Sequence, residues 1–240
     1  TRRVAAGCGP QTASIIFGGV TGPSATPGSS PESPSNTSFD YNGTSWTSNP
    51  SMNTARYGLG GAGAGQSSAL GFGGYSSGVK ALTEEFNGSA WSESGDLGTA
   101  RYRLGSLGTQ TAAVGAGGYI YPSPSITNKV EEYNGSSWTE VNDYPSTIQG
   151  SAGSGTLTAG LIAGGRTSGA GPSKVTTATT YDGTNWTAAP SLATGRFNLS
   201  GSVTATSSAG LVSSGNNGSS PQNLTEEYTA SANVITAGAW

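Results

Sequence analysis

An internal repeat of about 50 residues is the feature that most constrains this chain. An aromatic residue followed five positions later by Trp occurs at four places, Tyr41/Trp46, Phe86/Trp91, Tyr133/Trp138 and Tyr181/Trp186. A looser fifth copy is Tyr228/Trp240. Each pair follows a short apolar run that ends in two glycines or a degraded form of them, and most copies open with Thr-x-Arg. Openings at residues 1, 54, 99, 146 and 194 give periods of 53, 45, 47 and 48 residues, the scale of one supersecondary unit.

Each copy is expected to form four short strands. The first follows the Thr-x-Arg element, the second enters the glycine pair, the third carries the first aromatic residue and the fourth carries the Trp. Asn42-Gly43 and its three equivalents lie between the last two strands, and such dipeptides favour a two-residue type I′ hairpin. With that turn, the aromatic residue and the Trp fall on one face as a diagonal cross-strand pair, an apolar face suited to stacking on the next sheet.

These units predict an all-β fold, a five-bladed β-propeller in a single domain covering residues 1–240. The expected blades are residues 1–53, 54–98, 99–145, 146–193 and 194–240. Forty glycines and a charged fraction of 10% are also compatible with a disordered chain, but aromatic residues at fixed spacing favour folding. Because the first copy begins on an inner strand and the last ends on an outer one, we expect the ring to close by side-chain packing without a shared strand.

Charge and composition exclude several classes of function. Histidine is absent, which removes Ser-His-Asp and Cys-His catalysis and the commonest metal ligand, so we expect no enzyme activity, no catalytic residue, no metal and no cofactor. The ten basic residues are scattered, so we expect neither nucleic-acid binding nor membrane insertion. We interpret Cys8 as a small buried residue. The chain does not begin with Met, so we expect it to start within a longer product or after a cleavage.

Together, the opening Arg, the diglycine, the Glu-Glu-Tyr segment and the spaced Trp resemble the kelch repeat. The sequence segment Glu-Glu-Tyr-Asn-Gly-Ser-Ser-Trp also resembles segments of kelch-like structural proteins of marine tailed phages. This resemblance implies a non-enzymatic virion-surface structural or adhesion protein, associated with a tail or fibre, located on the virion surface or outside the cell. Its partners would be other virion proteins or a host-surface glycan or protein, and oligomeric assembly is compatible with this role. The alternative is a secreted bacterial lectin-like propeller that binds carbohydrate.

Charged residues covary between the copies. An Arg opens four copies and an acidic residue precedes the third-strand aromatic in the same four, whereas the remaining copy has Ile148 and Thr180 at these positions. We therefore predict that each Arg pairs with this second acidic residue of its own blade. The predicted cations and anions are Arg3, Arg56, Arg101 and Arg196 with Asp40, Glu85, Glu132 and Glu227. We interpret the Glu-Glu pairs as structural because their repetition is not expected of a single catalytic or metal site.

The loops that join the second and third strands vary most between the copies and emerge on one rim of a propeller. Aromatic and basic residues in such loops are suited to contact with a sugar or a protein. The candidate binding residues are Tyr75, Tyr119, Tyr121 and Arg166.

Overall fold

The computed structural model describes residues 2–21, 33–121, 125–168, 173–202 and 209–229, and the backbone of residues 234–237. These ranges contain strands, turns and bends but no helix, so they also contain no helix that could cross a membrane. Most strands belong to five four-stranded antiparallel sheets, which we number sheet 1 to sheet 5 in chain order. A three-stranded and a two-stranded sheet complete the described strands.

Every four-stranded sheet uses consecutive segments of one repeat. Sheet 1 contains β2 (Ala6–Cys8), β3 (Ser14–Phe17), β6 (Ser38–Tyr41) and β7 (Trp46–Asn49). Sheet 2 contains β8 (Gly60–Gly65), β9 (Ser68–Phe72), β10 (Thr83–Phe86) and β11 (Trp91–Ser94). Sheet 3 contains β12 (Gly105–Thr109), β13 (Ala112–Ala116), β16 (Val130–Tyr133) and β17 (Trp138–Val141). Sheet 4 contains β18 (Ala152–Thr156), β19 (Ala159–Ala163), β20 (Ala178–Tyr181) and β21 (Trp186–Ala189). Sheet 5 contains β22 (Ser200–Gly201), β23 (Ala209–Ser213), β24 (Thr225–Thr229) and β25 (Val234–Ala237).

The smaller sheets lie near or within the loops between second and third strands. One pairs β4 (Val20–Thr21) with both β1 (Arg2–Arg3) and β5 (Ser33–Pro34). The other pairs β14 (Tyr119–Ile120) with β15 (Ser125–Ile126). The predicted order of four strands per repeat is therefore confirmed, and the N-terminal strands pair within their own repeat rather than with sheet 5.

The hairpin between the third and fourth strands differs from the predicted one. The aromatic residue and the Trp are directly opposite, as in Tyr133↔Trp138, so the diagonal pairing was wrong. The loop contains four residues, and only its glycine, such as Gly135, has a positive φ. Asn134 instead accepts hydrogen bonds through Oδ1 from the backbone N–H groups of Ser136 and Ser137, both at 3.0 Å. This side-chain cap stabilises the longer loop in place of a type I′ turn.

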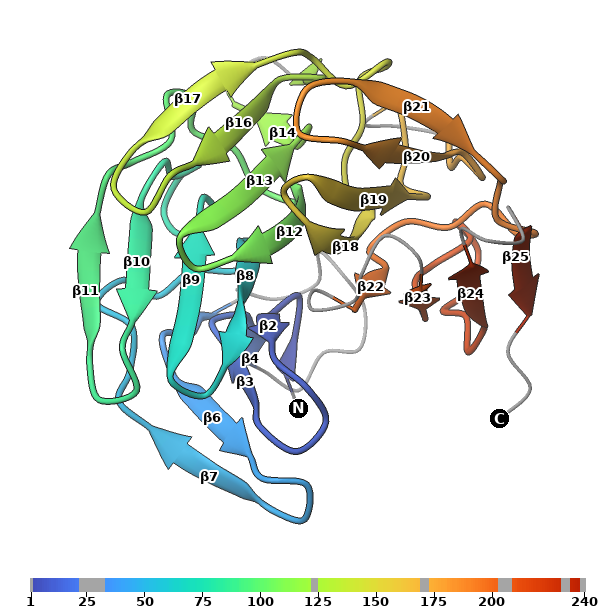
Figure 1. The fold of residues 1–240 in the computed structure, drawn as a ribbon. Helices are drawn as coiled ribbons and strands as arrows, with labels where there is room; N and C mark the ends of the chain where they lie inside the picture. The colour runs from blue at the N-terminus through green and yellow to red at the C-terminus, as the bar shows by residue number, and fades with distance from the viewer. Residues whose placement is uncertain are drawn as a thin grey trace.

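The four-stranded sheets stand side by side in an arc, with their first strands toward its centre (Figure 1). First strands of neighbouring sheets contact one another, and small residues permit this close approach. A Cβ at Gly153 would lie 1.9 Å from the backbone oxygen of Ser106 in the adjacent sheet. The high glycine content therefore reflects crowding near the axis rather than disorder. This β-propeller-like arrangement is the coarse fold predicted from the repeat.

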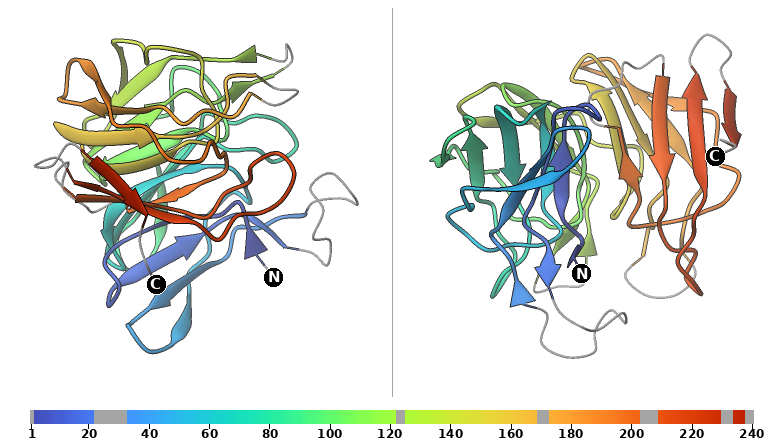
Figure 2. Two further views of the ribbon diagram at one scale, coloured as in Figure 1. Left: turned by 90° about the vertical axis from the view of Figure 1, so that its right-hand side faces the viewer. Right: turned by 90° about the horizontal axis from the view of Figure 1, so that it is seen from below.

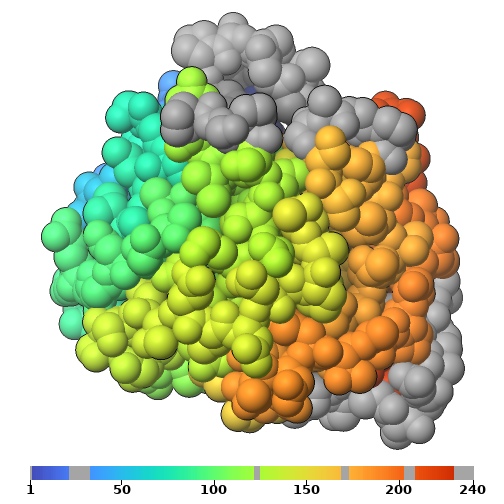
Figure 3. Space-filling view, turned by 90° about the horizontal axis from the view of Figure 1, so that it is seen from above, coloured from blue at the N-terminus to red at the C-terminus, as the bar shows by residue number. Residues whose placement is uncertain are grey.

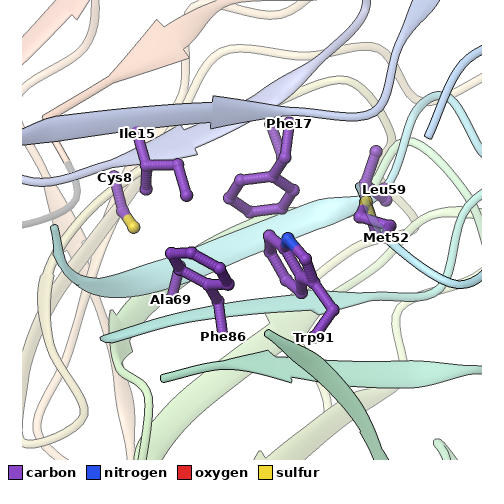
Figure 4. Close-up of a cluster of buried hydrophobic side chains, with 9 residues drawn as sticks. Cys8, Ile15, Phe17, Met52, Leu59, Ala69, Phe86 and Trp91 are labelled. Carbon is purple, nitrogen blue, oxygen red and sulfur yellow. The ribbon is translucent and has the colours of Figure 1, made fainter. Parts of the chain in front are cut away.

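Hydrophobic clusters fill the spaces between neighbouring sheets. Between sheets 1 and 2, Phe17 packs against Trp91 with ring centroids 4.9 Å apart, and Phe86 lies 5.1 Å from the same Trp (Figure 4). Phe72 of sheet 2 packs in the same way against Trp138 of sheet 3, at 4.6 Å. Each Trp in these contacts reaches back to the preceding sheet. The segments of sheets 2 to 4 form a continuous outer surface (Figure 3).

The expected packing between the first and last copies is not formed by the described residues. The ribbons of sheets 1 and 5 are separated by an interval (Figures 1 and 2). Trp46, which has no preceding sheet to reach, is 55% exposed, whereas Trp91 is 6% exposed. In sheet 5 the position opposite Tyr228 is Ile235, so Trp240 is not its strand partner and lies outside the described residues. The four inter-sheet packings set the curvature, and this curvature does not bring sheets 1 and 5 together.

Candidate functional site

A buried ion pair joins the opening of three repeats to the third strand, but the carboxylate is not the predicted one. Arg56, Arg101 and Arg196 are fully buried. Their Nη2 atoms donate to the first acidic residue of the strand rather than to the second. The observed pairs are Arg56–Glu84 at 2.8 Å, Arg101–Glu131 at 2.8 Å and Arg196–Glu226 at 2.5 Å. The predicted pairing with Glu85, Glu132 and Glu227 was therefore wrong.

The reason lies in strand alternation. In the sheet 3 strand β16, Glu131 is buried while Glu132 points to the other face, so only the former can meet the fully buried guanidinium. Glu131 also accepts backbone hydrogen bonds from Gly98 at 2.6 Å and Thr99 at 3.3 Å, in the segment that enters sheet 3. Burial lowers the pKa of Arg101, and the charge of Glu131 opposes this shift. The pair therefore anchors the inter-sheet connection.

In the first repeat, a different arginine and a different partner occupy the positions of the ion pair. Arg2, rather than the predicted Arg3, donates through Nη1 to the carbonyls of Gly18 and Thr37, both at 2.8 Å. These carbonyls match those that Arg101 uses in sheet 3. Phe39 replaces the glutamate, and the Arg2 guanidinium lies over its ring, 5.0 Å from the centroid. A cation–π contact thus substitutes for the ion pair. Because Phe39 is not acidic, the comparison of the repeats pointed away from this position and toward the second acidic residue.

The fourth repeat has lost both charges together. Ile148 is fully buried in place of the Arg, and Thr179 replaces the glutamate. The Tyr144 hydroxyl, which enters from the preceding connection, forms a hydrogen bond of 2.9 Å with Thr179 Oγ1. An apolar side chain and a neutral hydrogen bond therefore occupy a place that elsewhere holds an ion pair.

The second acidic residue of a strand binds the next sheet. Tyr133 of sheet 3 donates through its hydroxyl to Glu85 of sheet 2 at 2.5 Å, and Tyr181 of sheet 4 donates to Glu132 of sheet 3 at 2.7 Å. Asp40 of sheet 1 faces no such donor, because the equivalent position in sheet 2 is Phe86. Its Oδ1 atom is buried and has no hydrogen-bond partner among the described residues. Most acidic residues of the third strands therefore bind other parts of the fold.

No metal-binding group was found in the described ranges, where no three His, Cys, Asp or Glu side chains gather. Cys8 is buried at 4% exposure, and burial raises the pKa of its thiol to about 12. A thiol of this kind remains protonated and unreactive at neutral pH.

Aromatic side chains gather on the rim of the molecule where the first strand of each sheet begins. Tyr75 lies 5.4 Å from Tyr57 and 5.5 Å from Tyr102 between ring centroids, and Tyr102 lies 5.4 Å from Tyr119. All four rings are partly exposed. The reason they meet is the backbone pairing of Tyr57 with Tyr75 and of Tyr102 with Tyr119, which joins the entry of each sheet to the residue after its glycine pair.

Two arginines extend this row of tyrosines. The Arg103 guanidinium lies 5.5 Å from the ring centroid of Tyr102, and that of Arg166 lies 4.8 Å from the ring centroid of Phe197. Burial lowers the pKa of Arg166, and the positive charge of nearby Arg103 lowers it further. The Nε atoms of both arginines are buried without a hydrogen-bond partner, and neither guanidinium has a carboxylate within 4.0 Å in the described part of the chain. We call Tyr57, Tyr75, Tyr102, Arg103, Tyr119, Arg166 and Phe197 the tyrosine–arginine cluster.

An open row of backbone hydrogen bonds links the five sheets and includes Arg103 of the cluster. The residue two positions after each buried Arg or its equivalent has a φ between 53° and 63°. Each of these residues after the first donates its N–H to the carbonyl of the equivalent residue in the preceding sheet, at distances of 2.9, 2.6, 2.8 and 2.7 Å in chain order. We call this set the annulus; its members are Val4, Gly58, Arg103, Gly150 and Asn198. Three non-glycine residues adopt this unfavourable conformation, which positions Arg103 beside the tyrosines.

Below the annulus lies a cavity of about 420 Å³ along the axis. Its lining comes from the first strands of all five sheets and the residues directly before or after them, from Ser14, Ile15 and Ile16 of β3 and from Trp46, and it is made mostly of small and aliphatic residues. Among the described residues of this lining, Cys8 is the one with a titratable side chain, and burial keeps its thiol protonated. The cavity therefore offers little that could orient a polar substrate for reaction.

Three of the four predicted binding residues thus lie in one cluster. Tyr75, Tyr119 and Arg166 belong to it, whereas Tyr121 is 67% exposed and forms no ring contact with the cluster. Tyr57, Tyr102, Arg103 and Phe197 were not among the residues predicted from the sequence. The signal was present, because these residues directly follow the Thr-x-Arg elements, but it was assigned to a strand rather than to the same rim.

Comparison with known proteins supports the fold only. No family model matches the sequence, and no curated protein matches it. Among solved structures, the chain is similar to the one described as "Structure of YjhT", with a TM-score of 0.79 and 15% sequence identity. The match covers 99% of this chain and 84% of that chain. At this level of identity, the likeness places the chain among β-propeller-like folds and carries no function with it.

Proposed function

We propose that this chain is a non-enzymatic surface protein of a virion, a tail- or fibre-associated propeller whose tyrosine–arginine cluster contacts a glycan on the host surface. Residues 1–240 supply five kelch-type blades in this proposal. The observation that carries it is the cluster itself, with four tyrosines in tilted and edge-on ring contacts and two guanidiniums that lack a carboxylate among the described residues. Aromatic faces suit the apolar faces of sugar rings, and guanidiniums suit their acidic groups. An acidic glycan is the ligand class that combines both.

Catalysis is disfavoured by the same chemistry. The sequence contains no histidine, and the third-strand glutamates Glu84, Glu131 and Glu226 are buried in ion pairs. Carboxylates held in this way are poor candidates for general acids or metal ligands. A rigid scaffold with a polar, aromatic rim fits recognition better than reaction.

A glycan array tests the proposed ligand. We expect binding to acidic glycans and weaker binding to the matched neutral ones, with affinity falling as salt is raised. Arg166→Ala should weaken binding about 10- to 100-fold, because a charge-assisted hydrogen bond contributes about 1.5–3 kcal/mol. Lys129→Ala is the matched control, since this partly exposed cation is outside the cluster and is already paired with Glu140. Binding that is absent, or equally strong in Arg166→Ala, would refute the role of the cluster.

The virion assignment has a separate test. Neighbouring capsid or tail genes, and detection of the chain in purified particles, are the expected results. A gene neighbourhood of secretion and carbohydrate uptake, with glycan binding retained, would instead favour the secreted lectin.

A further inference from the structure

We infer that the interval between sheets 1 and 5 is the docking surface for one further four-stranded blade of the same repeat type. The surface has two walls, the face of sheet 1 that carries Trp46 and the face of sheet 5 that carries Leu211. Contacts that recur at each of the four inter-sheet boundaries stop at these walls. The occupant can therefore be specified from the chemistry of those boundaries.

The annulus is the first interrupted contact. Gly58, Arg103, Gly150 and Asn198 each donate an N–H to the preceding sheet. Val4 is the first member and has no acceptor for its N–H among the described residues, while the carbonyl of Asn198, the last member, has no donor there. A further blade with one residue in the same conformation would accept from the first and donate to the second. Because this hydrogen bond is made at all four inter-sheet boundaries, its absence at the two ends of the row among the described residues indicates a missing neighbour.

A second backbone contact stops at the same place. The second glycine of each pair donates to the carbonyl of the residue that opens the next repeat, as Gly19 does to Arg56 at 2.8 Å and Gly165 does to Arg196 at 2.7 Å. Gly215 occupies this position in sheet 5 and has no acceptor among the described residues. The expected acceptor is the carbonyl at the opening Arg of a sixth repeat.

The side chains of sheet 1 face the interval as their equivalents face a neighbour. The rings of Tyr41 and Trp46 are tilted by 34° with their centroids 5.0 Å apart, much as those of Phe86 and Trp91 are in sheet 2. The latter Trp is 6% exposed because Phe17 covers it, whereas Trp46 is 55% exposed. An aromatic or aliphatic residue at the end of a second strand would cover it. An exposed Trp with this geometry marks an interaction surface.

A tyrosine hydroxyl at one wall and a carboxylate at the other are also complementary to such a blade. Across the sheet 2/3 and 3/4 boundaries, a Tyr hydroxyl donates to the second acidic residue of the preceding sheet. Tyr41 supplies this donor at one wall of the interval, and exposed Glu227 supplies this acceptor at the other. A blade with a Glu-Glu-Tyr third strand would satisfy both at once.

The comparison with YjhT gives the size of the occupant. This chain aligns over nearly its whole length but covers 84% of that chain, so 16% (100 − 84) lies outside the match. Five sheets share the covered part, which is about 17% for each sheet (84/5). The uncovered part is therefore about the share of one sheet.

A repeat added to this chain tests the inference. In each of the four connections, the opening Arg or Ile stands seven residues after the last residue of the fourth strand (49 to 56, 94 to 101, 141 to 148 and 189 to 196). A copy of residues 98–145 joined after residue 240 places its Arg at position 244, seven residues after Ala237, the last residue of β25. The matched control is an extension of the same length and composition with the repeat in scrambled order.

Fluorine NMR of protein labelled with 5-fluorotryptophan reports on Trp46, whose resonance is assigned by its loss in Trp46→Phe. In the 240-residue chain, we expect this resonance to be broadened by a soluble paramagnetic agent. In the extended chain, it should be protected to the level of Trp186, the Trp that packs against sheet 3. The amides of Val4 and Gly215 should exchange at least tenfold more slowly. The scrambled extension should change neither.

Three results would overturn the inference. Protection of Trp46 in the 240-residue monomer would show that sheets 1 and 5 close on each other. Protection that depends on protein concentration, with a dimer in sedimentation, would identify a second copy as the occupant. An extended chain that is folded by circular dichroism but leaves Trp46 exposed would show that the interval does not accept a blade.

Discussion

Glu131→Gln removes one charge from the most completely buried polar contact of sheet 3. The glutamate side chain is 2% exposed and the Arg101 side chain is fully buried, with Nη2 and Oε1 2.8 Å apart. Glutamine keeps the size of the side chain but places an amide NH₂ group where one carboxylate oxygen accepts hydrogen bonds. The guanidinium then remains buried without a counter-ion, beside the backbone donors of Gly98 and Thr99.

Removing one partner of a buried pair costs about 3–5 kcal/mol, because the remaining charge is not compensated. This is a large part of the 5–15 kcal/mol that stabilises a typical domain. An exposed pair in the same sheet gives the contrast: Lys129 and Glu140 are 36% and 54% exposed, so Lys129→Ala should cost less than about 1 kcal/mol. The fourth repeat supplies a second comparison, since Ile148 and Thr179 fill the same place without charge. The double variant Arg101→Ile/Glu131→Thr should therefore be more stable than the two single costs predict.

Urea unfolding followed by tryptophan fluorescence measures these differences. The free energy of unfolding is compared at unchanged m-value, so that a change in midpoint reports stability. A loss below about 1 kcal/mol for Glu131→Gln would show that water reaches the pair and that its burial does not matter. Strict additivity in the double variant would show that the two charges are not coupled.

Further predictions concern crowding, pH and reactivity. Gly153→Ala should lower the unfolding midpoint because its Cβ would meet backbone at 1.9 Å, while Gly78→Ala, with nothing within 4 Å, should not. Burial, with a smaller contribution from the hydrogen bond to Glu85, raises the pKa of Tyr133 from 10.0 to about 12. Its hydroxyl therefore stabilises the fold below pH 10 and loses this effect between pH 10 and 12, so the stability difference between the parent and Tyr133→Phe, about 1 kcal/mol at pH 7, should shrink there. Cys8 should resist a thiol-specific disulfide reagent at pH 8 in the folded protein and react fully in urea; rapid reaction in the folded protein would contradict its burial.

Periodicity alone determined the all-β class, the number and order of strands in each repeat and the aromatic pairs of the third and fourth strands. These features are local, because turn residues and alternation act within a few positions of the chain. The same periodicity identified Tyr75, Tyr119 and Arg166 as rim residues. It could not place Tyr75 beside Tyr102, because that contact requires two sheets to be placed side by side.

Tertiary structure decided which charges meet and whether the arc closes. The choice of Glu131 over Glu132 depends on which face of β16 turns toward buried Arg101, and one residue of register exchanges the two faces. In the first repeat, the partly buried Arg2 rather than Arg3 takes the position of the opening Arg, because its guanidinium reaches Phe39 and the carbonyls of Gly18 and Thr37. The interval beside Trp46 depends on the sum of four inter-sheet packings, each set by contacts between residues far apart in the sequence. The total curvature is a property of the assembled sheets and cannot be read from the sequence of a single repeat.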